Sequence, residues 1–177
     1  MKYLKLFEGY QSEAEVAEIC QRYGIENWTL NSNGLIDVDG RVDLEDLEGS
    51  KLTKLPLKFG HVTCFFCSHN RLTSLEGAPH TVDDDFWCIN NDIRSFEGLL
   101  NIKGGFYCFS NPIFEIWKII QWGTGSDTHK WDNEKMEFFN DLDIIHGEEI
   151  AIERLNFFLE EMGLEPVESV KGYKNIY

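Results

Sequence analysis

The feature that most constrains the fold of this chain is a repeat of about 20 residues in its middle. Three segments share the pattern Phe-aromatic-Cys-x-x-Asn-x-Leu/Ile, and they are 65–72, 86–93 and 106–113. Their asparagines lie 21 and 20 residues apart, at Asn70, Asn91 and Asn111. A fourth, degenerate copy precedes them at 40–44 and 52–55, interrupted by an insertion at 45–51. We expect such a chain to fold by stacking equivalent units, each of which contacts its neighbours.

Within each repeat the apolar residues alternate with period two, which predicts a short strand. The residues expected to face a common core are Phe65, Cys67, Phe86, Cys88, Phe106 and Cys108. We expect the asparagine after each strand to turn inward and to bond backbone groups that the turn leaves unpaired. The pattern is that of the leucine-rich repeat, L-x-x-L-x-L-x-x-N-x-L, with Phe and Cys in two strand positions. The predicted fold is therefore α/β, a short leucine-rich-repeat solenoid with parallel strands.

Helices are expected on both sides of the solenoid. Ser12 to Glu15 reads as a capping box for a short helix that ends at Gly24. Apolar residues at helical spacing predict further helices near 114–121, 133–145 and 148–162, with a polar loop at 123–127. The expected segments are an N-terminal cap at 1–34, the solenoid at 35–116 and a C-terminal helical segment at 117–177. Because an open solenoid exposes its core at both ends, these helices are expected to be caps.

The chain is strongly acidic, with 31 Asp and Glu against 16 Lys and Arg and a net charge of −15. The excess lies at the two ends: residues 1–49 carry −7, residues 50–121 carry 0 and residues 122–177 carry −8. A field of this sign repels phosphate backbones, so we expect no direct contact with nucleic acid. No apolar run approaches the ~18 residues of a membrane span, and five cysteines suit reduced thiols in the cytoplasm.

Two groups of residues could suggest a metal site. Cys64 and Cys67 have the spacing of a metal or redox motif, with His61 and His69 nearby. Strand alternation instead places Cys67, Cys88 and Cys108 in one row in the core. A buried thiol there behaves as a small apolar group. The acidic stretches 37–40 and 83–85 lack the spaced oxygen ligands of a calcium loop. We expect no metal and no cofactor.

Catalytic signatures are also missing. The five histidines have no accompanying nucleophile motif, and they are His61, His69, His80, His129 and His146. The glycine pairs near 104 and 123 lack the lysine and the strand-to-helix context of a phosphate loop. The chain is therefore not expected to be an enzyme.

The residues between the core positions point to a binding role. If Phe65 faces inward, its neighbour faces outward, so Phe66, Trp87 and Tyr107 are expected to form an aromatic column on the exposed face, extended by Ile89 and Phe109. Apolar patches of this kind mark interaction surfaces, and Trp and Tyr are frequent anchors. Three occupants remain open: an external protein partner, a second copy in a homodimer, or the C-terminal helices folded back over the column.

Three stretches resemble short leucine-rich-repeat proteins encoded by large tailed bacteriophages. They are the opening Met1-Lys2-Tyr3-Leu4-Lys5-Leu6-Phe7-Glu8, the stretch 72–79 and the strand 86–91. The resemblance covers roughly residues 1–116 and implies a repeat fold, an interaction role and a host protein as the target in the host cytoplasm. The repeat length is also similar to that of bacterial effectors that carry a ubiquitin ligase, but no cysteine follows Cys108 to act as the nucleophile. A second hypothesis is an acidic inhibitor that mimics nucleic acid with its charged ends.

Overall fold

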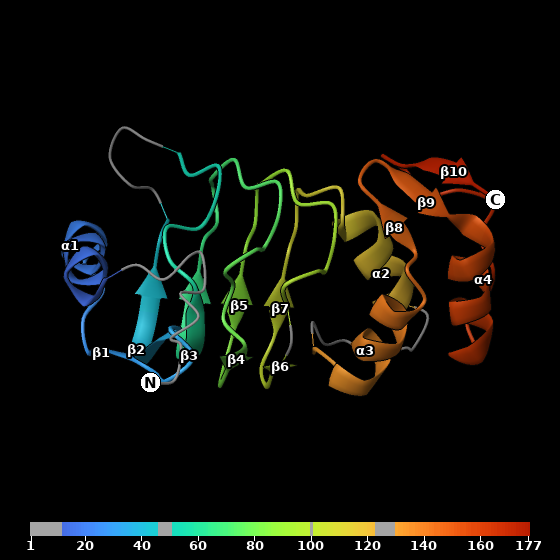
Figure 1. Cartoon of the computed structure of the whole chain (residues 1–177). Helices are drawn as coiled ribbons and strands as arrows, with labels where there is room; N and C mark the ends of the chain where they lie inside the picture. Colours follow the sequence, from blue (N-terminus) through green and yellow to red (C-terminus); the bar gives the residue numbers. More distant parts are fainter. Residues whose placement is uncertain (1–11, 46–50, 100, 123–129) are drawn as a thin grey trace, which may run out of the picture.

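A mostly parallel sheet occupies the middle of the molecule, and helices lie at both of its ends (Figure 1). The computed structural model describes residues 12–45, 51–99, 101–122 and 130–177. Four features of the sequence analysis lie outside these ranges, namely the opening segment 1–8, most of the insertion at 46–50, the polar loop at 123–127 and His129. The expected α/β class is confirmed.

Helix α1 (Glu13–Tyr23) covers the first end of the sheet and is set by local signals. The Ser12 side chain accepts a hydrogen bond from the backbone N–H of Glu15, whose carboxylate in turn accepts from the backbone N–H of Ser12. Gly24 ends the helix in the left-handed region, with φ of 63°. Strand β1 (Trp28–Leu30), which the sequence analysis does not anticipate, follows and pairs antiparallel with β2 (Ile36–Asp43).

The first two repeats each contribute one long strand to the large sheet, β2 and β3, and the next two each contribute two short strands. The remaining strands are β3 (Phe59–Phe66), β4 (Thr81–Val82), β5 (Phe86–Trp87), β6 (Asn101–Ile102) and β7 (Phe106–Tyr107). The long strand β3 pairs in parallel with β4 through its first half and with β5 through its second half. The pairs β4 with β6 and β5 with β7 continue this arrangement into the next repeat. The sequence analysis expects only the second strand of each repeat.

Equivalent residues of four consecutive repeats stand in register. Val42 of the degenerate copy pairs with Phe65, Phe65 with Phe86, and Phe86 with Phe106. The three phenylalanine side chains are fully buried, with centroids 5.2 and 5.8 Å apart along the row. A 20-residue spacing in the sequence thus becomes one step between neighbouring strands, because each repeat packs on the one before it.

The C-terminal segment differs from the expected run of helices. It comprises α2 (Phe114–Trp122), α3 (Asn133–Asp141), β8 (Ile145–His146), β9 (Glu149–Ala151), α4 (Ile152–Glu161) and β10 (Lys174–Ile176). The predictions of helix up to residue 145 and from residue 148 are wrong. Helix α3 ends at Asp141, shortly before Asp143 with φ of 49°, and Gly147, with φ of 64°, turns the chain between β8 and β9. Strand β10 then adds in parallel to β9 and completes a second sheet.

Aromatic rings close the end of the core next to β7. The indoles of Trp117 and Trp131 stack 5.7 Å apart, and each lies 5.2 Å from the ring of Phe106. Phe96 of the preceding turn contacts both indoles and the ring of Phe139 in α3. The C-terminal segment therefore continues the core of the repeats directly.

Candidate functional site

The outward aromatic residues form a column in which neighbouring rings stack. The ring of Phe66 lies 6.4 Å from that of Trp87, with 28° between their planes. Trp87 lies 4.2 Å from Tyr107, with 24° between the planes. The Arg41 guanidinium lies over the Phe66 ring, 5.3 Å from its centroid. We call Phe66, Trp87 and Tyr107 the aromatic column and the side of the sheet that carries it the outer face.

Stacking reduces the ring surface that the aromatic column exposes to a partner. All three residues are half-buried, because each ring shields the face of its neighbour. The two faces of the Trp87 ring are directed toward the rings of Phe66 and Tyr107, so the ring edge is what Trp87 offers to a partner. Strand alternation predicts that these side chains are exposed, and the structure corrects this prediction, since they are half-buried.

Ile89 and Phe109 lie on the same side and are also half-buried. The ring of Phe109 lies 4.9 Å from that of Phe114 at the start of α2. Beyond this contact, α2, α3 and α4 lie past β7 at one end of the row of strands, and α1 lies at the other end, beside β1 and β2 (Figure 1). None of these helices crosses β3, β5 or β7 in the part of the chain that the structure describes. The described helices therefore reach the outer face only at its edge.

A charged zone adjoins the column toward the amino ends of the same strands. Asp83 lies between two repeats, with one carboxylate oxygen 2.7 Å from His61 Nε2 and the other 2.6 Å from Lys103 Nζ. The hydrogen bond from Lys103, and next that from His61, lowers the pKa of Asp83 from its usual value. Cys64 directs its thiol to the same zone, with Sγ 3.7 Å from the Asp84 carboxylate. The sequence at 83–85 is compared above only with a calcium loop, and it gives no sign of this network.

The inward asparagines tie each repeat to the preceding one. The Asn91 side-chain oxygen accepts from the backbone N–H of Leu72 at 3.0 Å, and its Nδ2 donates to the backbone oxygens of Cys67 and Cys88. Asn70 and Asn111 make the equivalent set of bonds, and all three asparagines are buried. These bonds satisfy backbone groups inside the turn, as the repeat pattern predicts.

The cysteines of the repeats lie in a buried row. Cys67, Cys88 and Cys108 are at most 1% exposed, and burial raises the pKa of each thiol well above its usual value. All five cysteines of the chain are free, and Cys64 is half-buried on the outer side. No group of three or more His, Cys, Asp or Glu side chains is placed to hold a metal ion within the described ranges.

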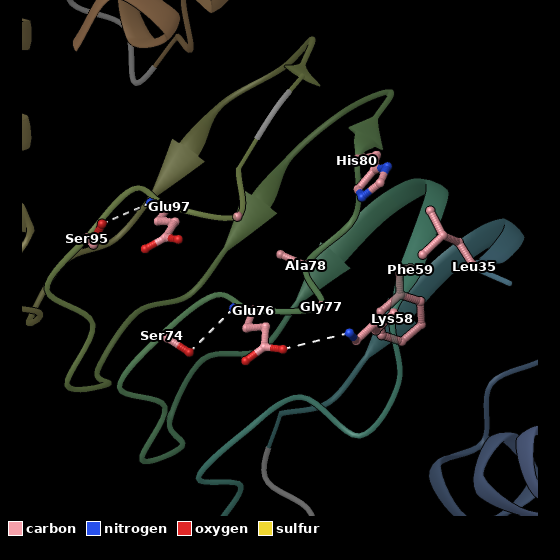
Figure 2. A pocket seen from close by; sticks show the side chains of 11 residues that line it. Leu35, Lys58, Phe59, Ser74, Glu76, Gly77, Ala78, His80, Ser95 and Glu97 are labelled. Carbon is pink, nitrogen blue, oxygen red and sulfur yellow. Dashed lines mark hydrogen bonds and ion pairs between the residues drawn. The ribbon is translucent and has the colours of Figure 1, made fainter. Parts of the chain in front are cut away.

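A groove of about 440 Å³ lies at the edge of the sheet and is formed by the same turn of two repeats (Figure 2). Each turn has the sequence Ser-x-Glu-Gly, at 74–77 and 95–98, and in each the serine oxygen accepts from the glutamate N–H. Lys58 pairs with Glu76 at 3.8 Å. Ser95 and Glu97 lie at one end of the view in Figure 2, and Leu35 and Phe59 at the other.

Among the described residues that line the groove, no hydrogen bond joins His80 to Ser74 or Ser95. The repeated Ser-x-Glu-Gly motif is the sequence signal that could have located the groove.

Comparisons with protein-family models, with curated proteins and with solved structures gave no match for this chain. No described helix is long and apolar enough to cross a membrane.

Proposed function

We propose that the chain is a short leucine-rich-repeat solenoid that binds a protein partner through its outer face and catalyses no reaction. The fold part of the proposal is supported by four repeats with equivalent residues in register across parallel strands and by the asparagine bonds between them. Its resemblance to phage-encoded repeat proteins supports a host bacterial protein in the cytoplasm as the target.

The binding role is carried by one observation, the concentration of apolar side chains on the outer face. Five half-buried residues gather there, where a solvent-facing strand ordinarily carries Thr, Lys or Glu: Phe66, Trp87, Ile89, Tyr107 and Phe109. Half-buried aromatic residues beside polar groups resemble the composition of protein interfaces, in which Trp and Tyr supply much of the binding energy.

Photo-cross-linking tests this proposal without disturbing the stacked rings. A photoreactive amino acid, p-benzoylphenylalanine, replaces Ile89 on the outer face in one variant and Phe157 on α4 in the other. Phe157 is the matched control because it is an apolar residue, 48% exposed, on a different part of the molecule. We expect irradiation in cells of the natural host to join a protein to position 89 and not to position 157.

The same pair of variants distinguishes binding through the outer face from the second candidate function, that of an acidic inhibitor. Exposed glutamates gather around α4, including Glu153, Glu160, Glu161 and Glu165. Cross-links at position 157 alone would place the partner on this acidic segment and support the inhibitor. Cross-links at neither position would contradict both candidates.

A further inference from the structure

The outer face combines its apolar residues with an excess of carboxylates. Six carboxylates lie on β2 and in the turn before β5, at Asp37, Asp39, Asp43, Asp83, Asp84 and Asp85, and two of the cations near them are Arg41 and Lys103. Both cations are already engaged, since Arg41 pairs with Asp43 and Lys103 with Asp83. Among the described residues, Asp39 and Asp84 are exposed and take part in no ion pair of this face.

The carboxylates and the aromatic column are contiguous. The Tyr107 ring lies against Gly105, since a Cβ added at Gly105 would lie 2.6 Å from Tyr107 Cε2. Burial raises the pKa of Tyr107, and the charges of Asp85 and Asp84 raise it further. Asp85 itself is held in place by the backbone N–H of Gly105, which donates to its carboxylate at 2.7 Å. A partner that covers the ring edges therefore also lies against these carboxylates.

Arg41 shows how a cation binds to this surface. Its guanidinium lies over the Phe66 ring and forms an ion pair with Asp43 at the same time. An arginine or lysine of a partner can repeat this mode, with its charged group on Asp39 or Asp84 and its aliphatic stem across the ring edges.

A second copy of the chain is a poor occupant by the same reasoning. Two outer faces, each with unpaired carboxylates and each on a chain of net charge −15, would bring like charges together. Charge complementarity instead favours a partner segment that is rich in basic residues.

We propose that the outer face binds a segment of a partner protein rich in arginine and lysine, with carboxylates holding the cations beside the aromatic column. This inference rests on the proposed function, because it names the chemistry of the partner for the same face.

The test uses a fluorescent peptide of alternating arginine and leucine as the probe, with binding followed by anisotropy. One variant combines Asp39→Asn with Asp84→Asn on the outer face. The matched control combines Glu160→Gln with Glu161→Gln on α4, so that both remove two exposed carboxylates from the same chain. We expect the outer-face variant to weaken binding roughly tenfold and the control to weaken it less than about twofold.

The outcomes separate this inference from the function on which it rests. Equal weakening by the two variants, or no binding of the probe, would overturn the basic-segment inference, because net charge alone would then explain the attraction. Cross-links from position 89 to a partner segment with no excess of arginine or lysine would also overturn it, while leaving the outer face as the docking site. Sedimentation provides a further check, since a stable dimer abolished by Ile89→Glu would assign the face to a second copy instead.

Discussion

The indole of Trp87 stacks on the phenol ring of Tyr107, with 4.2 Å between centroids and 24° between planes. The two residues pair across β5 and β7 and belong to neighbouring repeats. Their contact joins the repeats on the outer side of the sheet, as the contact of Phe86 with Phe106 joins them in the core. Side chains that could anchor a partner therefore also stabilise the fold.

Removal of the central ring of the column should lower stability. Loss of an exposed side chain, as the alternation predicts for Trp87, would leave stability nearly unchanged, but the structure places the Trp87 ring between those of Phe66 and Tyr107. We expect this change to lower the free energy of unfolding by about 2–4 kcal/mol, through lost burial and two lost ring contacts. Urea denaturation followed by far-ultraviolet circular dichroism measures the loss. The control Trp87→Tyr keeps an aromatic ring in the stack and should cost less, and an Ala variant as stable as the parent would contradict the structural role.

Loss of an inward asparagine should destabilise the turn between repeats. Asn91→Ala leaves the buried N–H of Leu72 without its acceptor and removes the donor to two backbone oxygens. We expect the free energy of unfolding to fall by about 2–4 kcal/mol. The neighbouring Asn90→Gly is the control, because Asn90 is exposed and its φ of 56° suits glycine. Similar losses for the two variants in urea denaturation would argue against the hydrogen-bond explanation.

One thiol should react before the others. Cys64 is half-buried, whereas Cys20, Cys67, Cys88 and Cys108 are at most 1% exposed. A maleimide reagent should label about one cysteine per native chain quickly, and mass spectrometry of peptides should place the label on Cys64. Cys64→Ser is the control and should abolish the fast phase. Fast labelling of several cysteines in the folded protein would show that the row of buried thiols is misplaced.

The rate of that fast reaction should depend on pH in a defined direction. Burial, the largest cause, raises the pKa of Cys64 above its usual value, and the Asp84 carboxylate raises it further, while the hydrogen bond with the Asp85 backbone lowers it. Because the thiolate is the reactive form, the labelling rate should rise about tenfold per pH unit up to pH 9 and should not level off there. Asp84→Asn removes one raising charge and should make labelling faster at pH 8. A rate that levels off near neutral pH would contradict a raised pKa.

Two glycines with positive φ should respond differently to the same substitution. A Cβ at Gly98, with φ of 96°, would lie 2.5 Å from the backbone oxygen of Leu75 in the preceding repeat, whereas a Cβ at Gly24, with φ of 63°, meets no atom within 4 Å. We expect Gly24→Ala to cost about 1–2 kcal/mol of stability for its left-handed backbone alone. Gly98→Ala should lower stability clearly more, because the backbone at Leu75 must also move to make room for the added Cβ. Equal shifts of the thermal midpoint would mean that the repeats are not packed this closely.

Much of the repeat region could be predicted because its signals are local or strictly periodic. Phe65, Phe86 and Phe106 recur at a constant spacing, and each repeat packs on its neighbour, so one period of sequence is one step in space. The capping box at Ser12 likewise involves residues three positions apart. Such features need no knowledge of distant contacts.

The C-terminal sheet could not be predicted in this way. Strand β9 spans Glu149–Ala151, and its parallel partner Lys174–Ile176 lies beyond an entire helix. Strands of three residues are too short to show an alternating pattern, and they form here because a distant segment supplies their hydrogen bonds. The helical spacing of Leu155 and Phe158 extended the prediction of helix backwards over residues that belong to the strand.

The sequence by itself determined on which side of each strand Trp87 and its equivalents lie, since alternation is a property of the extended backbone. Only the tertiary structure decided that their rings stack and hide one another, because ring orientation depends on the side chains of the neighbouring repeats. The same holds for Asp83, whose partners His61 and Lys103 are brought to it by strands from two other repeats. Contacts between side chains of different repeats depend on how the repeats pack together, so they cannot be predicted from the sequence of a single repeat.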